Sequence, residues 1–82
     1  MSNPEWYEFG GQTYNVDEQR HGGPWDRGSA DSYYRREESP HFYVGATHRS
    51  SKVVESAMTL DQINEYRAGY SYNESNHNYK EW

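Results

Sequence analysis

The sequence predicts a small α+β domain in which two short helices, at about residues 24–36 and 59–73, occur with one or two short β-hairpins and much irregular structure. Three observations lead to this expectation: a helix-capping signature ahead of a periodic aromatic stripe, a proline placed where a helix can begin, and a glycine pair between two aromatic runs. A chain of 82 residues is enough for one domain near the lower size limit. We therefore expect a single domain over residues 1–82, with flexible ends at 1–5 and 76–82.

Aromatic rings are expected to supply most of the core. Leucine, isoleucine, valine and phenylalanine together fall below the ~20% of residues at which disorder becomes the default expectation, and there is no cysteine to form disulfides or a thiolate zinc site. Nine tyrosines and three tryptophans compensate, because each such ring can bury roughly 150–250 Å². The net charge of -5 is moderate. A folded domain is therefore favoured over the alternative, a chain that folds in part only on a partner.

The first element is expected to be a β-hairpin within residues 6–16. Weakly alternating aromatic residues flank Gly10-Gly11, a pair that permits the positive φ angles of a two-residue hairpin turn. An isolated hairpin is barely stable in water, so this one must lie on the rest of the domain. Residues 17–23 then form a polar linker or turn.

The first helix is expected to begin at Pro24, because the first turn of a helix does not need the missing N–H. It must end before Ser39-Pro40, since the residue before a proline avoids the helical region. Gly28 is tolerated within it at a cost of roughly 1 kcal/mol relative to alanine. On helical spacing, one side carries Ala30, Tyr33 and Tyr34 with Trp25 at its edge, and the opposite side carries an i, i+4 ladder of Arg27, Asp31 and Arg35.

Residues 41–55 have an extended character. Two short β-prone runs, Phe42-Tyr43-Val44 and Lys52-Val53-Val54, flank a polar stretch at 47–51. A second hairpin with a longer loop is consistent with this pattern, and an irregular arm is nearly as consistent.

The second helix has the strongest sequence signal. Thr59 and Gln62 are spaced as a capping box, with Met58 and Ile63 at the positions of a hydrophobic staple. Ile63, Tyr66 and Tyr70 then recur at the i, i+3, i+7 spacing of one buried stripe. Gly69 within this helix would let another backbone come close.

The expected core combines aromatic rings from both helices and the loop between them with two helical glycines. Its members are Trp25, Gly28, Tyr33, Tyr34, Phe42, Tyr43, Ile63, Tyr66, Gly69 and Tyr70. This assignment leaves another set of rings for contact with a ligand, namely Trp6, Tyr7, Tyr72, Tyr79 and Trp82.

Catalytic chemistry is not indicated. The serines lie in no G-x-S-x-G elbow, and no glycine run has the spacing of a phosphate-binding loop. The carboxylate pairs at 26 and 31, or at 37 and 38, are better explained by a solvated helix face. The histidines, His21, His41, His48 and His77, fit no metal-ligand spacing. We expect no enzyme activity, no metal, no cofactor and no small-molecule substrate.

No apolar run approaches the ~18–20 residues of a membrane span, and the sequence shows no signal-peptide core. A cytoplasmic protein that does not bind membranes is therefore expected. The sequence leaves the oligomeric state open.

The middle of the chain is basic between two acidic flanks. Residues 27–52 have a balance of +2, whereas residues 1–26 and 53–82 have balances of -4 and -3. Basic side chains interleaved with aromatic rings are typical of surfaces that contact RNA phosphates and unpaired bases. The expected partner-binding residues are Arg27, Arg35, Arg36, His41, Arg49 and Lys52. With a net charge of -5, non-specific duplex binding is not expected.

Three segments resemble a group of short tailed-phage proteins and, in their layout, ribosome modulation factor. They are residues 24–34 (PWDRGSADSYY), residues 39–43 (SPHFY) and residues 65–70 (EYRAGY), and the resemblance covers about residues 24–73. Ribosome modulation factor is strongly basic, whereas this chain is acidic, and the segments 1–23 and 44–56 have no counterpart in it.

The resemblance implies two short helices packed through Gly28 and Gly69, and docking on ribosomal RNA with Arg27, Arg35 and Arg36 as phosphate contacts. The expected function is thus a non-catalytic accessory role, phage-encoded, in which the protein binds a host macromolecule, with the ribosome as the leading target. Two alternatives remain open. The acidic ends suit an inhibitor that binds a basic host protein, and the tyrosine-rich composition suits a structural or virion-associated protein.

Overall fold

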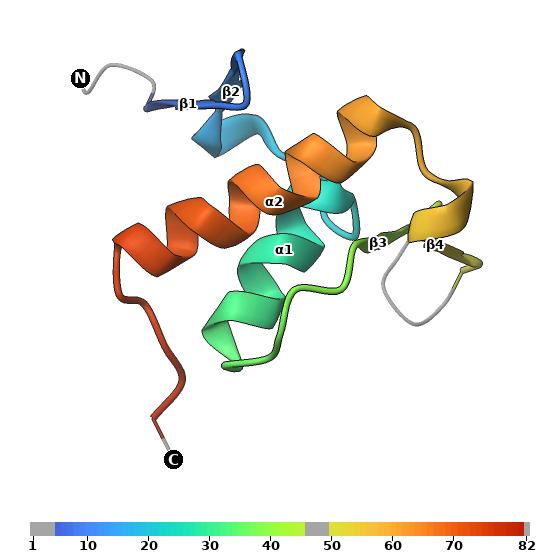
Figure 1. Ribbon diagram of the computed structural model, residues 1–82. Coiled ribbons are helices and arrows are strands. Elements are labelled where there is room, and N and C mark those ends of the chain that lie inside the picture. The colour runs from blue at the N-terminus through green and yellow to red at the C-terminus, as the bar shows by residue number, and fades with distance from the viewer. Residues whose placement is uncertain (1–4, 46–49, 82) are drawn as a thin grey trace.

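The computed structural model describes residues 5–45 and 50–81, which form two helices and two antiparallel two-stranded sheets (Figure 1). In chain order the elements are β1 (Trp6–Phe9), β2 (Gln12–Asn15), α1 (Pro24–Tyr33), β3 (His41–Tyr43), β4 (Lys52–Val54) and α2 (Leu60–Ser75). Short 3₁₀ turns follow β2 at Val16–Glu18 and β4 at Glu55–Ala57. The α+β class that the sequence predicts is confirmed.

The two helices cross with their backbones in contact (Figure 1). A Cβ atom at Gly28 would clash with the carbonyl oxygen of Tyr66, and one at Gly69 would clash with the carbonyl oxygen of Trp25. Each helix therefore contributes a glycine at the point where the other helix passes. This explains why residues that cost helix propensity stand within both helices, and it confirms that the helices pack through Gly28 and Gly69.

The capping box of α2 is present as predicted. The Thr59 hydroxyl accepts a hydrogen bond from the Gln62 N–H at 3.1 Å, and the Gln62 side-chain oxygen accepts one from the Thr59 N–H at 2.8 Å. The helix then continues to Ser75, two residues beyond the expected end.

The end of α1 differs from the prediction. The helix stops at Tyr33 rather than near Arg36, because Arg35 adopts a left-handed backbone conformation with φ of 60°. The Arg35 N–H then bonds the Ser32 carbonyl at 2.9 Å, and the Arg36 N–H bonds the Asp31 carbonyl at 2.8 Å. These two bonds form a Schellman motif, the usual helix terminus, in which an arginine occupies the position that glycine normally takes.

Both predicted hairpins are present. Gly10 and Gly11 connect β1 to β2 with φ of 58° and 80°, as a type I′ turn requires. Strand β3 pairs with β4 in the register that places Phe42 opposite Val53. The longer-looped hairpin is therefore confirmed over the irregular arm, while residues 46–49 of its loop lie outside the described part of the chain.

The core is aromatic, and its centre is Trp25. The Trp25 ring lies 5.6 Å from the Tyr14 ring, 5.6 Å from that of Tyr72 and 6.1 Å from that of Tyr7, measured between centroids. Tyr66 is fully buried between the helices and the segment before β3. The expectation that Tyr7 and Tyr72 are available for a ligand is wrong, because both rings pack against Trp25.

The predicted core residues fall into three groups. Trp25, Gly28, Tyr43, Tyr66 and Gly69 are buried, and Tyr33, Phe42, Ile63 and Tyr70 are half-buried. Tyr34 is exposed, and its placement in the core is wrong: it is the C-terminal cap of α1 rather than part of the buried helix face.

The solvated ladder of Arg27, Asp31 and Arg35 is also wrong. Asp31 is only 3% exposed, since it faces α2, and Arg35 lies beyond the helix. The predicted flexible ends lie partly outside the described residues, at 1–4 and 82. Of the described C-terminal segment, Lys80 donates its N–H to the Tyr33 carbonyl at 2.8 Å.

Candidate anion-binding pocket

A basic pocket of about 280 Å³ opens where the end of α1 meets the β3–β4 hairpin. Its walls come from α1, from the connection between α1 and β3, and from both strands of the hairpin. The lining residues are Arg27, Asp31, Arg36, Glu37, Ser39, His41, Tyr43 and Lys52. We call this cavity the basic pocket.

The basic pocket brings together four of the six partner-binding residues that the sequence predicts: Arg27, Arg36, His41 and Lys52. Arg35 lines a different cavity. Arg49 lies outside the described residues. The residues that converge span 25 positions of the chain, from Arg27 to Lys52. The hairpin register that pairs Tyr43 with Lys52 brings the lysine to the same cavity as the residues of α1.

Asp31 forms the floor of the basic pocket. Its Oδ2 accepts a hydrogen bond from the Tyr66 hydroxyl at 2.5 Å, and its Oδ1 lies 3.4 Å from Nη1 of Arg36. The Tyr66 oxygen in turn accepts the Ser39 N–H at 2.9 Å. Burial, and then the hydrogen bond to Asp31, raise the pKa of Tyr66 above its ordinary value of 10.0. Tyr66 therefore keeps its proton and acts as the donor to the Asp31 carboxylate.

The partners of His41 assign its tautomer. Its Nδ1 lies 2.7 Å from the Ser39 carbonyl oxygen, which can only accept, and its Nε2 lies 3.5 Å from Nε of Arg27, which can only donate. The ring proton is therefore on Nδ1. Oδ2 of Asp31 stands 3.8 Å from the same nitrogen. In this way His41 joins the buried carboxylate to the guanidinium of Arg27.

Arg27 is held in place, and Arg36 reaches into solvent. The Arg27 side chain is 11% exposed, and its guanidinium carbon lies 5.8 Å from the centroid of the Tyr43 ring. The Arg36 side chain is 57% exposed, and Lys52 is exposed on β4. The basic pocket thus has one immobilised cation in its wall and two exposed cations at its rim.

This arrangement suits an oxyanion such as a phosphate group. Three cationic side chains line the basic pocket together with the carboxylates of Asp31 and Glu37, and a third carboxylate, that of Asp26, lies 3.9 Å from Nη1 of Arg27. The charge of Asp31 is already engaged by Tyr66 and Arg36. Planar guanidinium groups bind phosphate oxygens with two parallel hydrogen bonds, and a fixed guanidinium loses little entropy when it does so.

A second cavity has a volume of about 360 Å³. Its lining residues are Arg35, Tyr70, Glu74 and Tyr79. The guanidinium carbon of Arg35 is 5.3 Å from the centroid of the Tyr79 ring. The Tyr70 hydroxyl donates to the carbonyl oxygen of Arg36, a residue of the basic pocket, and this hydrogen bond connects the two cavities. We call this one the tyrosine pocket.

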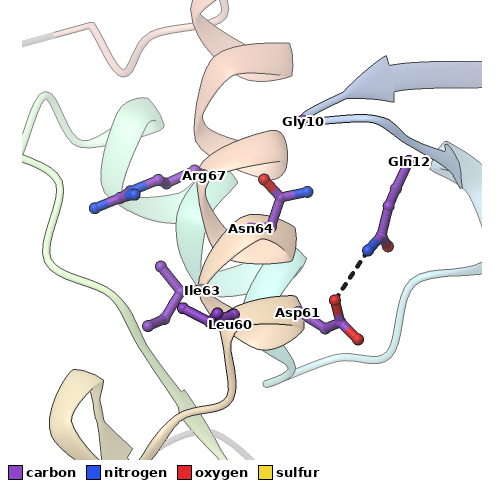
Figure 2. A pocket seen from close by; sticks show the side chains of 7 residues that line it. All are labelled: Gly10, Gln12, Leu60, Asp61, Ile63, Asn64 and Arg67. Carbon is purple, nitrogen blue, oxygen red and sulfur yellow. Dashed lines mark hydrogen bonds between the residues drawn. The ribbon is translucent and has the colours of Figure 1, made fainter.

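A third cavity, of about 300 Å³, lies between the first hairpin and α2, lined by Gly10, Gln12, Leu60, Asp61, Ile63, Asn64 and Arg67 (Figure 2). Gln12 donates to Asp61 at 2.9 Å, as Figure 2 shows. Asn64 donates to the Phe9 carbonyl at 3.2 Å and to the Tyr14 hydroxyl at 2.7 Å. These hydrogen bonds join the first hairpin to α2, so we infer that this part of the interface holds the hairpin on the helix.

Sequence reasoning missed Asp31, Glu37 and Ser39 as lining residues of the basic pocket, and it missed the Tyr66 hydroxyl as the hydrogen-bond partner of Asp31. Asp31 was assigned to a solvated helix face, and Tyr66 to the core as a ring only. In the part of the chain that the structure describes, no group of three or more His, Cys, Asp or Glu side chains is placed to hold a metal ion. Nor does any helix among the described residues have the length and apolarity to cross a membrane.

Comparisons of the chain with models of protein families, with curated proteins and with solved structures give no match.

Proposed function

We propose that this protein is a non-catalytic, phage-encoded accessory protein of the host cytoplasm that binds a host RNA, with the ribosome as the leading target, by holding a backbone phosphate in the basic pocket. The observation that supports the proposal is the convergence of Arg27, Arg36 and Lys52 on one cavity of an otherwise acidic chain. The fixed guanidinium of Arg27 acts as the first contact, and the two rim cations close on the same phosphate or on its neighbour.

The distribution of charge supports local docking rather than general attraction to nucleic acid. A net charge of -5 repels a polyanion at long range, so the basic pocket supplies the contacts only where it meets the phosphate directly. The acidic flanks then disfavour other orientations of the protein on RNA.

Salt dependence tests the number of phosphate contacts. Each contact with single-stranded nucleic acid contributes about 0.7 to the slope of log K against log salt concentration. Three cations in the basic pocket therefore predict a slope of about -2 for binding to purified bacterial ribosomal subunits, measured by co-sedimentation between low and physiological salt. A slope near zero would contradict phosphate contact.

A pair of charge reversals tests the location. Lys52→Glu should weaken binding on the order of tenfold, because one charge-assisted contact of about 1.5 kcal/mol is lost. Arg67→Glu is the matched control, since it makes the same change of charge at an exposed residue of a different cavity (Figure 2). Equal losses of binding in the two variants would overturn the proposal. So would capture of a basic protein whose complex resists RNase and is unaffected by either substitution, a result that would favour an acidic inhibitor.

A further inference from the structure

The tyrosine pocket contains two aromatic rings whose polar ends are already bonded within the protein. The Tyr70 hydroxyl donates to the Arg36 carbonyl. Partial burial, and then a hydrogen bond to the Glu74 carboxylate, raise the pKa of Tyr79. Glu74 is itself fixed, because its Oε2 accepts the Ser32 hydroxyl at 2.5 Å. Both rings are therefore held in orientation, and each is half-buried, so part of its surface is left for a ligand.

Arg35 gives the tyrosine pocket a cation and connects it with the basic pocket. Its left-handed conformation, with φ of 60°, is one that non-glycine residues rarely adopt, and it sends Arg35 and Arg36 into different cavities. Strained conformations of this kind persist where the surrounding structure over-determines them, and they cluster at functional sites. A residue without a side chain would satisfy the helix terminus; the guanidinium here adds a planar cation beside Tyr79.

We propose that the tyrosine pocket takes an unpaired nucleobase of the RNA whose phosphate lies in the basic pocket. This inference rests on the proposed function, and it specifies the substrate as single-stranded rather than duplex RNA. Tyrosine rings and arginine planes stack on bases that are not already stacked in a helix. Consecutive residues line the two cavities, Arg35 the tyrosine pocket and Arg36 the basic pocket, and the Tyr70 hydroxyl donates to the carbonyl oxygen of Arg36. This connection fits a ligand whose flat group and anionic group are joined by one sugar.

Three RNA probes separate the base contact from the phosphate contact: an unstructured ten-nucleotide RNA, the same backbone with abasic sites throughout, and a hairpin duplex of equal phosphate number. We expect the wild-type protein to bind the first about 5- to 150-fold more tightly than the other two, the range that stacking of one base supplies. Binding is measured by fluorescence anisotropy at one salt concentration.

Two variants locate the effect. Tyr79→Leu keeps an apolar side chain but removes the ring, and it should reduce affinity for the ten-nucleotide RNA to that of the abasic backbone. Arg35→Gly keeps the left-handed conformation and should weaken the same complex. Tyr79→Phe retains the ring but loses the hydrogen bond to Glu74, so it should keep most of the affinity that Tyr79→Leu loses. A thermal melt of each variant checks that it is folded. If Tyr79→Leu does not fold, the affinity of Arg35→Gly for the ten-nucleotide RNA tests the base pocket instead.

The outcomes distinguish the two proposals. Equal affinity for the unstructured and abasic RNAs, with no effect of the variants, would overturn the base pocket and leave the phosphate contact standing. Failure of all three RNAs to bind would overturn both.

Discussion

Arg35 is a single residue at which stability and binding are expected to oppose each other. It occupies the left-handed position of a Schellman motif, where glycine avoids a strain of roughly 1–2 kcal/mol. Arg35→Gly should therefore raise the free energy of unfolding by up to about 1 kcal/mol, because glycine's extra freedom in the unfolded chain offsets part of the gain. Chemical denaturation measures the change. A variant less stable than the wild type would contradict this expectation, because it would show that the Arg35 side chain stabilises the fold by more than the strain costs.

Tyr66 couples the fold to alkaline pH. Its folded-state pKa is raised above the ordinary value of 10.0 by burial and by Asp31, so its contribution to stability is fully present below pH 10 and is lost as the pH rises above it. Tyr66→Phe should lower stability at pH 7 by about 1–3 kcal/mol, because it leaves the buried Asp31 carboxylate and the Ser39 N–H without this partner.

The same variant should lose less stability than the wild type between pH 9 and pH 11. Tyr14, Tyr70 and Tyr72 also have raised pKa values, mainly through burial, so some alkaline sensitivity remains in both. Denaturant titrations at stepped pH compare the two proteins, and parallel losses of stability would refute the role of Tyr66.

Single residues also mark the limit of what the sequence can predict. A glycine at position 35 would have predicted the end of α1. Because an arginine occupies that position, the sequence predicts a helix that continues to residue 36. The placement of Asp31 on a solvated face is a separate error. Its burial depends on where α2 crosses and on a hydroxyl 35 residues away, and local spacing contains neither fact.

At the scale of elements, the helix crossing is the feature most sensitive to added volume. Gly28→Ala and Gly69→Ala each improve helix propensity by about 1 kcal/mol, yet each puts a Cβ atom against a backbone carbonyl of the other helix. Backbone atoms cannot move aside as a flexible side chain can, so both variants should be destabilised by about 1–3 kcal/mol. Urea denaturation tests this, with Arg67→Ala as an exposed control on α2 that should stay within about 0.5 kcal/mol. Stabilisation by either glycine variant would contradict the close crossing.

Elements with a local chemical signature were predictable, and those positioned by tertiary contact were less so. The Gly10-Gly11 turn and the capping box of α2 each reside in a few adjacent residues, and both are confirmed. The ring cluster around Trp25 was not predicted. Tyr7 and Tyr72 pack on Trp25 because the first hairpin lies on α2. The sequence indicates that the hairpin must pack against another part of the domain, but it does not identify that part.

The molecule as a whole is acidic, yet its fold forms one cationic site. The basic middle of the sequence folds so that Arg27, Arg36 and Lys52 meet in one cavity, and the tyrosine pocket lies next to it through Arg35. The sequence predicted the identity of four residues of the basic pocket. It did not predict that Arg35 lines a separate cavity, beside the left-handed turn at that residue.

The most direct test of the central claim is to map the bound RNA onto the protein by NMR. In a titration of ¹⁵N-labelled protein with the unstructured ten-nucleotide RNA, the account predicts that the side-chain Nε–Hε signals of Arg27 and Arg36 shift, together with the backbone amides of Arg35, Lys52 and Tyr79. The Arg67 side chain serves as the internal reference and should stay unchanged. Shifts confined to other surfaces, or none at saturating RNA, would contradict the assignment of the basic pocket as the binding site.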